Sequence, residues 1–82
     1  MNDEALNARL AELVGADGST FDVIRDDRLY RSLMDRFDVD LSWSEGVWCA
    51  QIVGPDGIAR EEEDVVAARA AGRVILAAHG VR

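Results

Sequence analysis

The chain has 82 residues and a formal net charge of −7, from 16 acidic and nine basic side chains, and every basic residue is an arginine. One domain fits this length and a second does not. The excess of carboxylates argues against direct binding to nucleic acid or to an anionic membrane, because both require positive charge at the contact. It fits a basic protein partner, a salt-rich cytoplasm or simple solubility.

The cysteine count and the hydropathy pattern exclude further classes. Cys49 is the only cysteine, which excludes an internal disulfide and a cysteine-based zinc site. The opening "MNDEALNARL" has no basic region followed by an apolar stretch, and the longest apolar run, "VILAA" at 74–78, is far shorter than a membrane span. We expect a cytoplasmic protein without a cofactor or a metal.

The first predicted helix covers residues 3–14. Asn2 or Asp3 can cap its start, and Gly15 suits a left-handed residue at its end. The helix has an apolar face at the 3.6-residue period, made by Leu6, Leu10, Leu13 and Val14.

A loop and a second helix follow. "GADGST" at 15–20 has the composition of a loop. Residues 21–24 remain open between a strand, which their alternation indicates, and a helix start capped by Ser19 or Thr20. A helix is predicted at 26–36. Its apolar stripe consists of Leu29, Tyr30, Leu33, Met34 and Phe37.

The hydrophobic period then changes from helical to alternating. Residues 37–43 and 47–53 are predicted strands, joined by a two-residue loop at Glu45-Gly46. This register places every large apolar side chain on one face, and a slip of one residue would not. The predicted cross-strand pairs are Trp43 with Trp48, Leu41 with Ala50, and Val39 with Ile52.

The last third of the chain contains a turn, a short strand and a helix. "GPDG" at 54–57 is a tight turn, 58–60 is a short edge strand, and a helix is predicted at 62–79. Gly72 in this helix is expected where the helix and sheet backbones approach closely. The predicted fold is α+β, with a small three-stranded antiparallel sheet (37–43, 47–53, 58–60) and helices (3–14, 26–36, 62–79) packed on one face.

Four consecutive acids, Glu61, Glu62, Glu63 and Asp64, are predicted at the start of the last helix. In a helix they point in four directions and cannot jointly hold one metal ion. The helix macrodipole accounts for acids in a first turn, each stabilised by about 0.3–1 kcal/mol. A concentrated acidic patch that binds a partner is the functional alternative.

The open face of the predicted sheet is a second candidate contact surface. Asp38 and Asp40 are expected there with Ser42 from one strand, and Glu45 lies in the adjoining turn. The next strand contributes Val47, Cys49, Gln51 and Val53. A solvated face and a contact with a partner or a second copy both fit this mixture.

The sequence offers no catalytic constellation. "DVDLSWSEG" from Asp38 resembles the opening of a calcium loop, but Trp43 occupies its required glycine and Cys49 its closing acid. His79, the only histidine, has no nucleophile placed beside it by any motif, and "GADG" and "GPDG" match no nucleotide fingerprint. We therefore expect a protein that is not an enzyme.

The predicted order α-β-β-β-α, with an alanine-rich last helix, resembles the double-stranded-RNA-binding domain. That family carries lysines at the start of the last helix, where they contact phosphates. The matching positions here are Glu61, Glu62, Glu63 and Asp64, so the charge is inverted and the resemblance implies no RNA binding.

"VWCAQIVGPDGIAREEEDVVAARAAG", residues 47–72, is similar to the small phage-encoded proteins called ABA-sandwich domains, which have a Trp-bearing hairpin and an Ala-rich closing helix. The resemblance implies a mobile-element origin, and small acidic proteins of that origin include anti-CRISPR inhibitors that imitate nucleic acid.

Together these observations predict a non-enzymatic protein that binds a basic, nucleic-acid-binding protein and blocks it. The expected contact residues are Glu61, Glu62, Glu63, Asp64, Asp38, Asp40, Glu45 and Gln51. The alternative is a homo-oligomeric accessory protein that pairs through the open sheet face or through the 58–60 edge.

Overall fold

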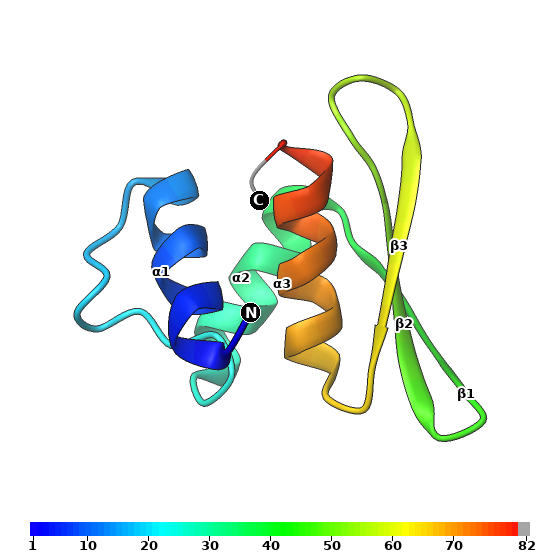
Figure 1. Ribbon diagram of the computed structural model, residues 1–82, viewed down its shortest axis with the longest axis horizontal. Helices are drawn as coiled ribbons and strands as arrows, with labels where there is room; N and C mark the ends of the chain where they lie inside the picture. The colour runs from blue at the N-terminus through cyan, green and yellow to red at the C-terminus, as the bar shows by residue number, and fades with distance from the viewer. Residues whose placement is uncertain (81–82) are drawn as a thin grey trace.

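The computed structural model describes residues 1–80 and has two layers of helix on one side of a sheet (Figure 1). The elements, in chain order, are α1 Asp3–Val14, α2 Asp27–Phe37, β1 Asp40–Ser44, β2 Val47–Val53, β3 Ala59–Asp64 and α3 Ala67–Ala78. The antiparallel sheet has the strand order β1-β2-β3. The predicted α+β class, with the helices on one face of the sheet, is confirmed.

The first two helices begin and end within one residue of the predicted positions. The side-chain oxygen of Asn2 accepts a hydrogen bond of 2.8 Å from the Ala5 N–H, and Gly15 ends α1 in the left-handed conformation. Asp26 caps α2 in the same manner, through the Leu29 N–H at 3.2 Å. Local capping chemistry therefore sets these boundaries.

The segment at 21–24 is neither strand nor helix. A turn covers residues 23–25, and the side chain of Asp22 accepts hydrogen bonds from the Ile24 and Arg25 N–H groups. Phe21 and Val23 are nevertheless buried, at 7% and 2% exposure. The alternating pattern therefore comes from a loop that places these two apolar side chains in the core.

Helix α3 is the middle of the molecule. It packs against β2 and β3 on one side and against α1 on the other, and α2 also contacts it (Figure 1). Gly72 is in a close approach, but to α1 and not to the sheet as predicted. A Cβ atom at Gly72 would lie 3.1 Å from Leu10 Cδ1 and 3.2 Å from both terminal methyl groups of Leu6.

The β1–β2 hairpin has the predicted register over its paired length. Trp43 lies opposite Trp48 and Leu41 opposite Ala50. The strand is shorter than predicted, because Asp38 adopts a left-handed conformation at the end of α2 and Val39 precedes the first paired residue. The hairpin end projects past the first turn of α3 in Figure 1, which agrees with the 55% exposure of Trp43.

The boundary between the third strand and the last helix differs most from the prediction. Residues 61–64 belong to β3, which is six residues long, and α3 begins at Ala67 and not at 62. The physical reason is pairing: β3 forms a ladder along β2 from Val53↔Ala59 to Trp48↔Asp64. A strand limited to 58–60 would leave most backbone groups on that side of β2 without partners.

The 54–57 turn is held by an ion pair between Asp56 and Arg60. Their closest atoms, Arg60 Nη2 and Asp56 Oδ2, are 2.8 Å apart, and the Ile58 N–H donates to Oδ1 of Asp56 at 3.1 Å. The Arg60 hydrogen bonds are the largest influence on the Asp56 carboxyl and, with the Ile58 N–H, they lower its pKa from 3.8 to about 2.

We expect the Asp56 carboxyl to titrate near this depressed pKa and to return toward 3.8 in Arg60→Gln. Because the folded-state pKa is the lower one, the carboxylate stabilises the turn above pH 3.8 and this contribution is lost as the pH falls toward 2. A carboxyl-detected NMR titration of both proteins measures the shift. An unchanged Asp56 midpoint in the variant would contradict this assignment of cause.

The described helices have 12, 11 and 12 residues. Within residues 1–80, none of them combines the length and the hydropathy that crossing a lipid bilayer requires.

Candidate interaction surface on the open sheet face

Strand alternation and register decide which acids meet on the open face. In β3, Glu61 lies opposite Gln51 and Glu63 opposite Cys49, while on the other side of β2 Asp40 also lies opposite Gln51. Residues opposite one another share a face, so these side chains form a row across all three strands. We call Asp40, Gln51, Glu61 and Glu63 the acidic row.

The acidic row is exposed and carries uncompensated charge. All four side chains are exposed to solvent, and within residues 1–80 no salt bridge includes Asp40, Glu61 or Glu63. The remaining residues of this face are Ser42, Ser44, Val47, Cys49, Val53 and Ala59. None of them is basic, so the described part of the face is electronegative.

Cys49 is a neutral thiol within this field. Its Sγ atom lies 3.6 Å from Oε2 of Glu61. Burial raises its pKa most, and the negative charge of Glu61, the hydrogen bond to Glu61 and the charge of Glu63 raise it further. A thiol held in its protonated form is a poor nucleophile.

Glu62 and Asp64 lie on the opposite face of the sheet, toward the helices. Glu62 lies opposite Ala50, and Asp64 lies opposite Trp48. The prediction that all four acids open a helix is therefore wrong, and only alternate residues of the run reach the open face. Alternation along the strand places Glu61 and Glu63 on one face and Glu62 and Asp64 on the other, whereas a helix would have directed the four side chains to four sides.

Asp64 has a structural role. Its side chain is only 12% exposed, lies 3.1 Å from Nη2 of Arg73 and 3.8 Å from Nη1 of Arg69, and accepts a 2.8 Å hydrogen bond from the Val66 N–H just before α3. Arg69 also forms two hydrogen bonds with Asp3, at 2.8 and 2.9 Å. Asp64 thus connects the end of β3 with α3 and with the start of α1.

Asp38 and Glu45 have left-handed backbones, with φ of 53° and 51°. Asp38 lies next to the acidic row, because it lines a hollow of about 280 Å³ with Asp40, Gln51, Phe37, Ile52, Val53 and Ala59. Glu45 lies in the hairpin turn at the other end of β1, so the structure does not bring it to this hollow.

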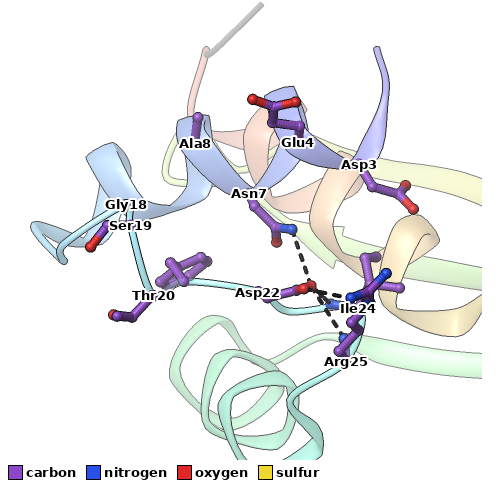
Figure 2. Close-up of a pocket in the computed structure, with 11 residues that line it drawn as sticks. Asp3, Glu4, Asn7, Ala8, Gly18, Ser19, Thr20, Asp22, Ile24 and Arg25 are labelled. Atoms are coloured by element: carbon purple, nitrogen blue, oxygen red, sulfur yellow. Dashed lines mark hydrogen bonds and ion pairs between the residues drawn. The ribbon is translucent and has the colours of Figure 1, made fainter.

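A larger hollow, of about 630 Å³, lies between α1 and the loop 18–25 (Figure 2). Asn7 and Asp22 are among the residues that line it, and a hydrogen bond of 3.2 Å joins them. No sequence motif points to this region. Within residues 1–80, every buried side-chain nitrogen or oxygen has a partner, so this hollow contains no buried polar side chain that lacks one.

The described residues contain no group of three or more histidine, cysteine or acidic side chains placed to hold a metal ion. His79 lies against Phe37, with ring centroids 5.0 Å apart in an edge-to-face arrangement. It is therefore a packing residue at the end of α3.

Comparison of the chain with protein-family models, with curated proteins and with solved structures finds no match in any of the three. In the double-stranded-RNA-binding domain the phosphate-contacting lysines lie at the start of the last helix. Residues 61–64 of this chain lie instead in β3 and precede the last helix, so they do not occupy the matching structural position.

Proposed function

We propose that the chain is a non-enzymatic binding domain whose open sheet face docks on a positively charged surface of a nucleic-acid-binding protein and blocks it. The observation that supports this proposal is the acidic row, three carboxylates on one uncovered face without a salt bridge in the part of the chain that the structure describes. Such a face attracts a basic surface and speeds association with it.

Charge also argues against two copies docking through the same face. Face-to-face pairing would bring Asp40, Glu61 and Glu63 of each copy toward those of the other, and like charges in contact are destabilising. A basic partner removes this penalty.

The hollow beside the acidic row suits an arginine side chain of the partner. Asp38 and Asp40 offer carboxylates to a guanidinium, and Gln51 offers an amide oxygen. Phe37 and Val53 supply an apolar wall for the methylene stem. Surfaces that bind nucleic acid are rich in arginine, so a protein docked here would compete with phosphates for the same side chains. An inhibitor of the anti-CRISPR kind is one form of such a protein.

Reversing the charge of the acidic row tests the proposal. We expect the double variant Glu61→Arg/Glu63→Arg to bind an immobilised arginine-rich peptide with an affinity at least about tenfold lower than that of the parent chain. The new arginines repel the basic peptide, which the glutamates of the parent chain attract. The affinity of the parent should fall as salt increases, since the contact is exposed. Surface plasmon resonance at two ionic strengths measures both effects.

The matched control is Glu12→Arg/Asp35→Arg, which changes the net charge by the same amount at exposed helical positions. Neither residue forms a salt bridge within residues 1–80. It should retain most of the binding. Equal losses in both double variants would show that net charge alone drives the association, and would refute a specific face.

The inhibitory part of the proposal needs a natural partner. Proteins captured from a lysate at low salt and released at high salt should include a nucleic-acid-binding protein, and the purified partner should lose nucleic acid when this chain is added. If the partner binds the chain and nucleic acid together without competition, the face is a docking surface but does not block.

A further inference from the structure

Two edges of the sheet are free in the described chain. β1 and β3 each pair only with β2, so each has an outer row of backbone N–H and C=O groups without a strand partner. Such edges pair with another strand unless charge, proline or a bulge prevents it. The two edges differ sharply in this respect.

The β3 edge is protected by its own charges. It carries five consecutive charged residues, Arg60 to Asp64. In an antiparallel pairing of two copies centred on Glu62, Glu62 would lie opposite itself and Glu61 opposite Glu63 of the second copy. Directly opposed like charges destabilise a strand pair. The β3 edge is therefore a poor site for self-association.

The β1 edge has no such protection. Its sequence Asp40–Ser44 contains one charged residue, at one end, and neither proline nor lysine. In an antiparallel pairing centred on Ser42, Ser42 lies opposite Ser42 of the second copy, Leu41 opposite Trp43, and Asp40 opposite Ser44. All five residues pair without opposed charges.

The backbone pattern agrees with this register. The hairpin closes with a two-residue loop, so Ser44 and Val47 are expected to exchange hydrogen bonds, and the pattern alternates along the ladder. Leu41 and Trp43 then direct their N–H and C=O groups to the free edge. These are the two residues that lie opposite each other in the pairing of two copies.

The exposed Trp43 side chain supports the same pairing of two copies. Trp43 is 55% exposed on the helix side of the sheet, and its ring contacts Trp48 edge-to-face, with centroids 5.1 Å apart. In the register centred on Ser42, Leu41 of the second copy would pack beside it as a cross-strand apolar pair. Burial of an exposed tryptophan is favourable.

We propose that two copies of this chain pair antiparallel through their β1 edges, centred on Ser42, to form a continuous six-stranded sheet. The two acidic rows then lie on the same face of one sheet. The proposal does not rest on the basic partner, since it uses a different edge and different forces.

The test is sedimentation equilibrium of the chain alone over a range of concentrations. We expect a monomer–dimer equilibrium that Ser42→Lys and Ser42→Glu each weaken about fivefold or more, because each places like charges opposite one another at the centre of the pairing. An equimolar mixture of the two variants should restore the dimer. A parent chain that stays monomeric up to about 1 mM overturns the proposal.

Ser44→Lys is the matched control, because it makes the same charge change on the same strand but lies opposite Asp40 of the second copy. It should tighten the dimer. A shift of Ser42→Lys and Ser44→Lys in the same direction would show an effect of net charge and would refute the register, as would a mixture that stays monomeric. Circular dichroism verifies the fold of each variant, and the result is independent of any basic partner.

Discussion

Leu10→Ala is expected to lower the free energy of unfolding by about 2–5 kcal/mol, the range for removing a large aliphatic side chain from a packed core. Leu10 is 0% exposed and packs on α3 at Gly72. The remaining cavity cannot collapse easily, because Leu6, which lies beside the same glycine, is also buried. For a domain of this size the loss is a large part of the total stability. Equilibrium denaturation with urea measures it.

Gly72→Ala provides the control for this packing. In the parent chain its new Cβ would lie 3.1 Å from Leu10 Cδ1, which offsets the gain of about 1 kcal/mol in helix propensity. In the Leu10→Ala background that methyl group is gone, so Gly72→Ala should be more favourable there. An identical effect of Gly72→Ala in both backgrounds would contradict direct packing between the two residues.

Asn7→Ala is expected to cost about 1–3 kcal/mol, although it removes no large apolar group. Asn7 is 9% exposed, and its side-chain oxygen accepts a 2.8 Å hydrogen bond from the buried N–H of Val23. Its amide nitrogen donates to Asp22 at 3.2 Å (Figure 2). Without Asn7, the Val23 N–H loses its buried partner. Thermal and urea unfolding measure the loss, and faster hydrogen exchange at Val23 locates it.

Asn7→Asp separates the two hydrogen bonds. It keeps an acceptor for Val23 but places a carboxylate against Asp22, so at neutral pH it should also be destabilising. Glu4→Ala, at an exposed neighbour in the same hollow, should change the stability by no more than about 0.5 kcal/mol. If Asn7→Ala is as mild as Glu4→Ala, the Val23 hydrogen bond does not hold the loop.

The hairpin and the first two helices could be predicted because short-range signals decide them. Gly15 and the Asn2 cap define α1, and the alternation on both sides of Glu45-Gly46 admits only one register with the apolar side chains together. The same alternation predicted that Asp40 and Gln51 share the open face. These are local patterns that tertiary contacts reinforce.

The segment 61–66 could not be predicted in this way. Glutamates are depleted in strands and are acceptable in a helix start, so local preference favours a helix there. Long-range pairing with β2 decides the outcome. One signal was available: a seven-residue strand at 47–53 requires a partner of similar length, and a strand of three residues does not provide it. Val65 and Val66 also favour an extended chain over a helix.

Gly72 shows a different limit of sequence analysis. Its position in mid-helix indicates a close approach, but nothing in the sequence tells which neighbour comes close. The neighbour is α1, 62 residues earlier at Leu10, because α3 lies between α1 and the sheet. Similarly, Asp64 belongs to the same run of acids as Glu63, yet only its contact with Arg73 reveals that it is structural.

The central position of α3 has a consequence for the order in which the molecule can form during synthesis on the ribosome. Both the sheet and α1 pack mainly on α3, which follows them in the chain and therefore leaves the exit tunnel after them. Until it emerges, the apolar sides of α1 and of the hairpin have no surface to cover them. Nascent chains in that condition are vulnerable to aggregation, so completion of the core is expected to follow translation of α3.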